Sequence, residues 1–176
     1  MPTDLRLIAA AIAGLACAAP AAAQTTPAPT PCTDAIYRQQ DFTVGHWDVY
    51  NGDKKSAEVL MEASLGGCAI HETWTVPAGK KGNGLGLFVY SDLLKTWHYL
   101  WASDTGSTTS FKGAEVKPGE IRYVTEKPLA DGKVRLRHWS LILQPDGKVR
   151  ELSVGTEDGG TTWTTEYDLT WVKKVH

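Results

Sequence analysis

Apolar and polar positions alternate along most of the chain from residue 44 onward, which is the pattern of β-strands with one buried face. Short turn signals separate ten such stretches, among them Asn51-Gly52, Asp131-Gly132 and Asp146-Gly147. The predicted strands are residues 44–51, 55–64, 69–76, 84–91, 95–103, 107–114, 120–127, 133–144, 148–156 and 162–173.

The spacing between these strands decides how they pair. It leaves no room for a crossover helix, so the strands must pair consecutively and antiparallel. Such a meander can hide its edges by closing, which predicts an all-β, antiparallel up-and-down β-barrel of about ten strands. A β-sandwich is the alternative, but its Greek-key connections usually need longer loops. Only residues 33–40 predict a helix, a short one with Thr33 or Asp34 as its N-cap.

The alternation also assigns strand faces. Trp47 shares a face with Gly45 and Val49, and Trp171 shares one with Tyr167, whereas the opposite faces of the first and last strands are polar. The aromatic faces therefore form the predicted interior. Each strand's histidine lies opposite its tryptophan, so we expect these histidines to point outwards and predict no interior metal site. They are His46, His71, His98 and His138.

The predicted interior is the place for a functional site. A barrel of about ten strands can leave a cavity, and an apolar cavity with a few polar groups is the usual form of a small-molecule site. Because buried charges must be paired, we expect Glu72 to contact Arg135 or Arg137 across the lumen. The candidate ligand-binding residues are Glu72, Trp74, Trp97, Tyr99, Trp101, Tyr123, Arg135, Arg137, Trp139 and Glu151.

Composition narrows the class of protein. The 176 residues carry 18 Lys+Arg against 20 Asp+Glu, a formal net charge of -2, which provides no basic field for nucleic acid. The chain is too apolar for disorder, and nothing after its first 25 residues approaches a membrane span. These features predict one globular domain, residues 32–176.

The N-terminus predicts export. A short polar start precedes the apolar stretch from Leu7 to Ala19, and Ala21-Ala22-Ala23 supplies a small-residue cleavage site. We expect a signal peptide over residues 1–23, then a Pro-rich linker over residues 24–31, and a periplasmic or secreted mature protein. A membrane anchor and a lipoprotein attached at Cys17 are the alternatives.

Two cysteines, Cys32 and Cys68, remain after the predicted cleavage. In an oxidising compartment a disulfide between them is the default expectation, and its role would be to pin the N-terminal segment to the barrel. A redox-active pair is the rival, but the two cysteines lack the CxxC spacing.

Some stretches resemble known families. Gly45-His46-Trp47-Asp48-Val49, after a short helix, resembles the Gly-x-Trp start of lipocalins and their calycin relatives, in which the tryptophan closes one barrel end. Residues 66–74 (GGCAIHETW), 89–101 (VYSDLLKTWHYLW) and 146–163 (DGKVRELSVGTEDGGTTW) resemble an exported bacterial family of unknown function with a lipocalin-like barrel. This resemblance implies a fold and a compartment, but no activity.

Residues 156–163 also resemble the Asp-box of sialidases, which is a structural turn in those proteins. The resemblance implies that Asp158 accepts backbone N–H groups and that Gly159-Gly160 supplies positive φ.

Three functions remain open. The sequence contains no GxSxG elbow, HExxH motif or P-loop. We therefore favour a barrel that binds a small lipophilic or aromatic molecule in its lumen without a cofactor. The alternatives are a cofactor-free lyase or isomerase that uses Glu72 and Arg137, and a structural barrel with a filled core.

Overall fold

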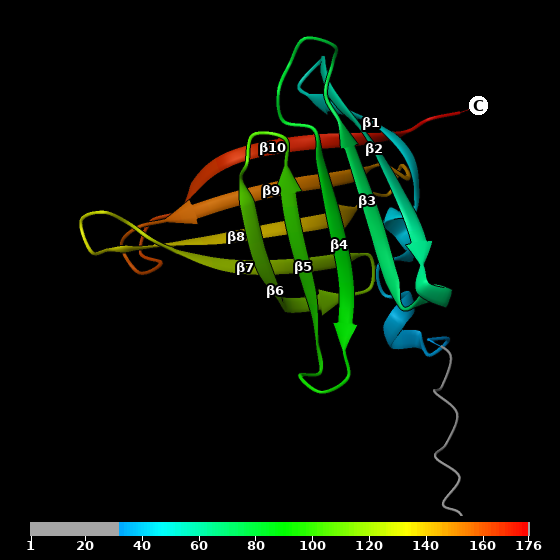
Figure 1. The fold of residues 1–176 in the computed structure, drawn as a ribbon, viewed down its shortest axis with the longest axis horizontal. Coiled ribbons are helices and arrows are strands. Elements are labelled where there is room, and N and C mark those ends of the chain that lie inside the picture. Colours follow the sequence, from blue (N-terminus) through cyan, green and yellow to red (C-terminus); the bar gives the residue numbers. More distant parts are fainter. Residues whose placement is uncertain (1–31, 176) are drawn as a thin grey trace, which may run out of the picture.

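The computed structural model describes residues 32–175, which form a closed barrel of ten antiparallel strands (Figure 1). Each strand pairs with the next along the chain, and the first pairs with the last. The predicted all-β up-and-down barrel is thereby confirmed. The 3-10 helices and strands are η1 (Ala35–Arg38), η2 (Asp41–Thr43), β1 (Gly45–Asn51), β2 (Lys54–Ser64), η3 (Leu65–Gly67), β3 (Ala69–Thr75), β4 (Gly84–Ser91), β5 (Thr96–Ser103), β6 (Thr108–Lys117), β7 (Glu120–Pro128), β8 (Val134–Leu143), β9 (Val149–Thr156) and β10 (Thr164–Lys173).

The strand bounds agree with the predicted ones to within two residues, except in β6. This strand continues to Lys117, because its pairing with β7 shifts register between Gly113 and Glu115. The extra residue of a β-bulge breaks the alternation, so the pattern seemed to end where the strand continues. Of the helix predicted over residues 33–40, the structure has the short 3-10 segment η1, and a second 3-10 segment, η2, follows beyond the predicted range.

The two ends of the barrel differ, because the N-terminal helical segments cover only one of them. At one end η1 and η2 pack beside the start of β1, and they are drawn in blue beside the barrel in Figure 1. There Trp47 Nε1 donates to the Thr43 carbonyl oxygen at 2.7 Å, and Trp97 Nε1 donates to Gln39 Oε1 at 2.9 Å. These bonds tie the N-terminal segment to the barrel wall and close this end.

A disulfide joins Cys32 to Cys68, as predicted, with a Cα–Cα distance of 4.9 Å. Cys68 directly follows η3, between β2 and β3. Arg38 reinforces this connection, since its Nη2 donates to the carbonyl oxygens of Gly67 and Cys32. The start of the described chain is therefore held at the closed end by a covalent bond and by partly buried hydrogen bonds from Arg38.

The loops at the other end include the turn between β9 and β10. Asp158 accepts the Thr162 backbone N–H at 2.9 Å and the Thr156 hydroxyl at 2.6 Å. Gly159 and Gly160 have φ of 71° and 94°, the left-handed region that favours glycine. The predicted Asp158 turn is thus present.

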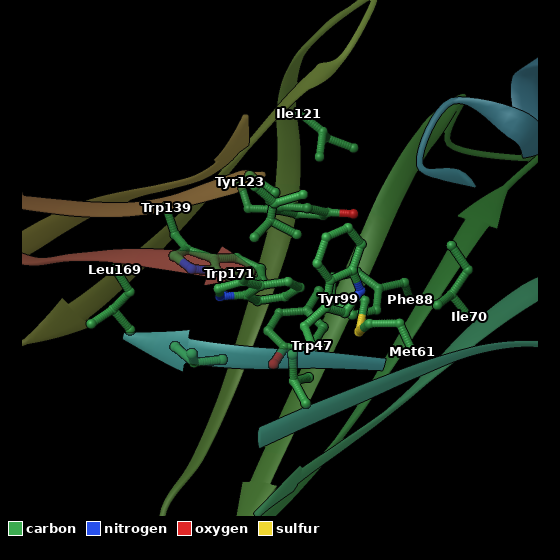
Figure 2. Close-up of a cluster of buried hydrophobic side chains, with 14 of the residues drawn as sticks. Trp47, Met61, Ile70, Phe88, Tyr99, Ile121, Tyr123, Trp139, Leu169 and Trp171 are labelled. Carbon is green, nitrogen blue, oxygen red and sulfur yellow. The ribbon is translucent and has the colours of Figure 1, made fainter. Parts of the chain in front are cut away.

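The aromatic faces form the core, as the alternation predicted. Trp47, Trp97, Tyr123, Trp139 and Trp171 are each at most 3% exposed. Figure 2 shows most of these rings gathered inside the barrel with Phe88 and Tyr99.

The predicted signal peptide, its cleavage after Ala23 and the Pro-rich linker lie outside the described residues. Among residues 32–175, no helix combines the length and the apolarity required to cross a membrane.

Candidate functional site

A cavity of about 380 Å³ lies inside the barrel, toward the end opposite η1 and η2. Its wall comes from the late residues of β3 and β5 and from the early residues of β2, β6, β8 and β10, which lie near that end, and from Glu151 in the first half of β9, which lies deeper. The lining residues are Ser56, Glu72, Trp74, Val76, Tyr99, Trp101, Thr109, Phe111, Arg137, Trp139, Glu151, Tyr167 and Leu169.

Stacked rings form the floor of this cavity. Tyr99 stacks on Trp139 with ring centroids 4.7 Å apart, and on Phe88, which lies deeper, at 4.1 Å. Trp74 and Trp101 stand nearer the mouth and meet edge to face at 6.5 Å. The cavity is therefore mainly aromatic, as the interior parity predicted.

Glu72 on β3 is the first of two buried carboxyl groups in the cavity wall. The Tyr99 hydroxyl donates to its Oε2 at 2.7 Å. Burial raises the pKa of Glu72 to about 8. The hydrogen bond from Tyr99 lowers this pKa, whereas the charge of Glu151 raises it further. Gly86 lies directly across from Glu72 on β4, and a Cβ there would overlap Glu72 Oε2. The space for this carboxyl therefore depends on a missing side chain.

Glu151 on β9 is the second buried carboxyl. Trp139 Nε1 donates to one of its oxygens and Trp171 Nε1 to the other, each at 2.9 Å. Burial raises the pKa of Glu151, and hydrogen bonds from these two indoles and from Tyr167 oppose that effect. Because an indole N–H only donates, both oxygens of Glu151 are held as acceptors.

The expected contact of Glu72 with an arginine is wrong. Arg137 Nε lies 2.5 Å from Glu166 Oε2, and Arg135 Nη2 lies 2.6 Å from Glu166 Oε1. Arg135 also pairs with Glu157 at 2.6 Å. Both guanidinium groups thus pair with carboxylates at the barrel mouth, and neither reaches across the lumen to Glu72.

Glu166 reaches this position because of a β-bulge. The pairing of β10 with β9 shifts register between Thr165 and Tyr167, which leaves Glu166 as the extra residue. Its carboxylate also accepts the Ser153 hydroxyl at 2.7 Å, and it lies beside Gly155, where there is no side chain to displace it. Strict alternation would place Glu166 on the polar outer face, because its neighbour Tyr167 belongs to the inner face.

The structure brings together seven of the ten predicted ligand-binding residues. Trp97 and Tyr123 are buried in the core below the cavity, and Arg135 lies outside it, with Glu157. The seven that line the cavity are Glu72, Trp74, Tyr99, Trp101, Arg137, Trp139 and Glu151.

Sequence reasoning missed two glycines that shape the cavity. Gly84 and Gly86 of β4 both point inward, and Trp101 and Tyr99 respectively occupy the space that their side chains would take. Their alternation with Leu85 and Leu87 was a usable signal, since glycines on the inner face of a strand leave room for large side chains opposite.

Comparison with known proteins adds no relative. No protein-family model matches the chain. A search of curated proteins likewise found no match.

Proposed function

We propose that the protein binds a small, largely apolar or aromatic molecule in its barrel cavity. The observation that carries the proposal is an aromatic-lined cavity of about 380 Å³ whose wall contains two buried carboxyl groups. This volume lies within the range of about 300–1,000 Å³ typical of small-molecule sites. Buried carboxyls cost folding free energy, so their position at a cavity supports a role in binding.

We further propose that the protein is exported and belongs among the lipocalin-like barrels. The Cys32–Cys68 disulfide supports an oxidising compartment. Support for the lipocalin likeness comes from one barrel end, where Trp47 packs beside a short N-terminal helical segment.

Native mass spectrometry of the protein isolated from the compartment to which it is exported tests this proposal. We expect a mass excess over the polypeptide that disappears on denaturation and identifies the bound molecule. The control is the same protein after delipidation and refolding, which should show no excess and should regain it from an extract. A protein that emerges without any bound molecule and does not take one up would contradict the proposal.

A second candidate function is acid–base catalysis on a molecule held in the same cavity. Glu72 favours it, because a carboxyl with a pKa of about 8 can give or take a proton near neutral pH. Glu72→Gln separates the two functions, since a binder loses only part of its affinity and an acid–base enzyme loses most of its turnover. A filled-core structural barrel is the reading that the cavity supports least.

A further inference from the structure

Within the described part of the chain, two carboxyl groups of the cavity wall have no cationic partner, so the wall becomes negative when they ionise. Glu72 and Glu151 are 2% and 6% exposed, and in the part of the chain that the structure describes neither forms a salt bridge. The cationic group of the wall, Arg137, is paired with Glu166. Its charge is therefore offset at the mouth and does not compensate the two carboxyls.

The hydrogen bonds to these carboxyls come from neutral donors. Glu72 accepts from the Tyr99 hydroxyl, and Glu151 accepts from two indole N–H groups. Such donors stabilise a carboxylate but leave its negative charge in place. Each carboxyl also raises the free energy of ionising the other, which is consistent with the raised pKa of Glu72.

The rest of the wall suits an organic cation better than a hydrated one. The faces of Tyr, Trp and Phe rings attract a cation through their quadrupoles, and the attraction grows when water is excluded. Trp74, Tyr99, Trp101, Phe111 and Trp139 supply such rings around Glu72 and Glu151.

We propose that the ligand of this cavity is an organic cation: a single positively charged nitrogen on a small aromatic or apolar body. The nitrogen lies near Glu72 and Glu151, and the body packs against Trp74 and Trp101. This inference rests on the proposed function and adds the charge of the ligand to it.

Protonation of Glu72 competes with such a ligand. A cation favours the ionised carboxyl, so binding releases a proton below pH 8 and strengthens as the pH rises. The other titratable and charged groups that line the cavity with Glu72 are Tyr99, Arg137, Glu151 and Tyr167. Glu166 pairs with Arg137. The tyrosines stay protonated throughout, because burial raises the pKa of both.

A pair of isosteric probes tests the inference. Benzyltrimethylammonium carries a permanent positive charge, and neopentylbenzene has the same shape with carbon in place of nitrogen. Binding is measured by tryptophan fluorescence and calorimetry at pH 9 and pH 6. At pH 9 we expect the cation to bind at least about tenfold more tightly than the neutral probe, a preference of roughly 1.4 kcal/mol that shrinks at pH 6. Glu72→Gln removes most of the preference, whereas Glu62→Gln on the outer surface keeps it.

The outcomes separate this inference from the proposed function. Equal affinity for the two probes, or tighter binding of neopentylbenzene, overturns the cation inference and leaves a cavity for apolar ligands. Binding of neither probe contradicts both. The comparison of probes on the wild-type protein decides the matter even if Glu72→Gln fails to fold.

Discussion

At the scale of single residues, alternation located the two carboxyls but not their partners. Period-2 parity places Glu72 and Glu151 inside because it depends only on local strand geometry. Which donors they meet depends on side chains from β5, β8 and β10, and no local pattern encodes that. Three predicted ligand-binding residues lie outside the cavity for the same reason, since parity gives the face and not the depth along the barrel.

The Glu72 carboxyl makes stability depend on pH. The folded protein keeps its proton up to pH about 8, whereas the unfolded chain releases it near the ordinary pKa of 4.5. Between these values the unfolded state binds fewer protons, so this group's contribution is complete below pH 4.5 and is lost as the pH rises toward 8. We expect the stability of the wild-type protein relative to Glu72→Gln to fall by up to about 1.4 kcal/mol per pH unit over this interval.

Urea unfolding at several pH values, with the disulfide intact, measures this difference. Subtracting the free energy of unfolding of Glu72→Gln from that of the wild-type protein at each pH cancels the contributions of the other titrating groups. Glu62→Gln serves as the surface control and should follow the wild-type profile. Parallel profiles for the wild-type protein and Glu72→Gln would show that burial does not hold the proton on Glu72.

Gly86 offers a steric test of the same site. In Gly86→Ala the new Cβ would meet Glu72 Oε2 and lie 2.6 Å from Tyr99 Cε2, so both side chains must move. We expect a loss of about 1–3 kcal/mol of stability from overpacking, together with weaker probe binding. Thermal unfolding and the fluorescence titration measure the two effects. Leu85→Ala, at an outward position of the same strand, is the control for binding; unchanged binding by Gly86→Ala would mean that the Glu72–Tyr99 pair does not contact the ligand.

At the scale of elements, the strands were predictable because each one carries its own signal. Their bounds follow from alternation and from turn residues such as Asn51-Gly52, which act locally. The bulges in β6 and β10 were not predictable, because an extra residue is defined only against the partner strand. The β10 bulge matters most, since it turns Glu166 inward. Arg135 and Arg137 then pair with Glu166 and not with Glu72.

The disulfide holds two segments of the chain together at the closed end and does not touch the cavity. It links the segment before η1 to the residue after η3, across a sequence separation of 36 residues. Closing a loop of this length restricts the unfolded chain, so we expect the double variant Cys32→Ser/Cys68→Ser to lose up to about 4 kcal/mol. Urea unfolding of the variant beside the oxidised wild-type protein measures the loss. Because Cys32 and Cys68 lie at the closed end, probe affinity should remain within about twofold, a change of about 0.4 kcal/mol. A large loss of affinity would show that the two ends are coupled.

At the scale of the whole molecule, the two ends of the barrel differ: one is closed by tryptophans and the disulfide, and the other is an opening lined by charged side chains. The closed end is sealed by Trp47, Trp97 and the disulfide, whereas the mouth carries the cluster formed by Arg135, Arg137, Glu157 and Glu166. A formal net charge of -2 for the chain does not reveal this arrangement. The potential that a ligand meets is set by how the charges at the mouth pair with one another.

We therefore expect Glu166 to affect how tightly the cavity binds a charged ligand, although Glu166 does not line the cavity. In Glu166→Gln, Arg137 loses its carboxylate partner and its positive charge adds to the cavity wall, which opposes a cation near Glu72. We expect benzyltrimethylammonium to bind about three- to tenfold more weakly, a change of up to roughly 1.4 kcal/mol that shrinks in high salt.

Glu157→Gln is the matched control for this effect. It removes the same charge from the same mouth but from the partner of Arg135, which lies outside the cavity. Titration of both variants with benzyltrimethylammonium and neopentylbenzene at two salt concentrations separates charge from shape. A salt-dependent loss confined to Glu166→Gln and to the charged probe means that pairing at the mouth governs the field in the lumen. An equal loss in the two variants, or a loss shared by the neutral probe, means that the cluster only supports the fold of the β9–β10 region.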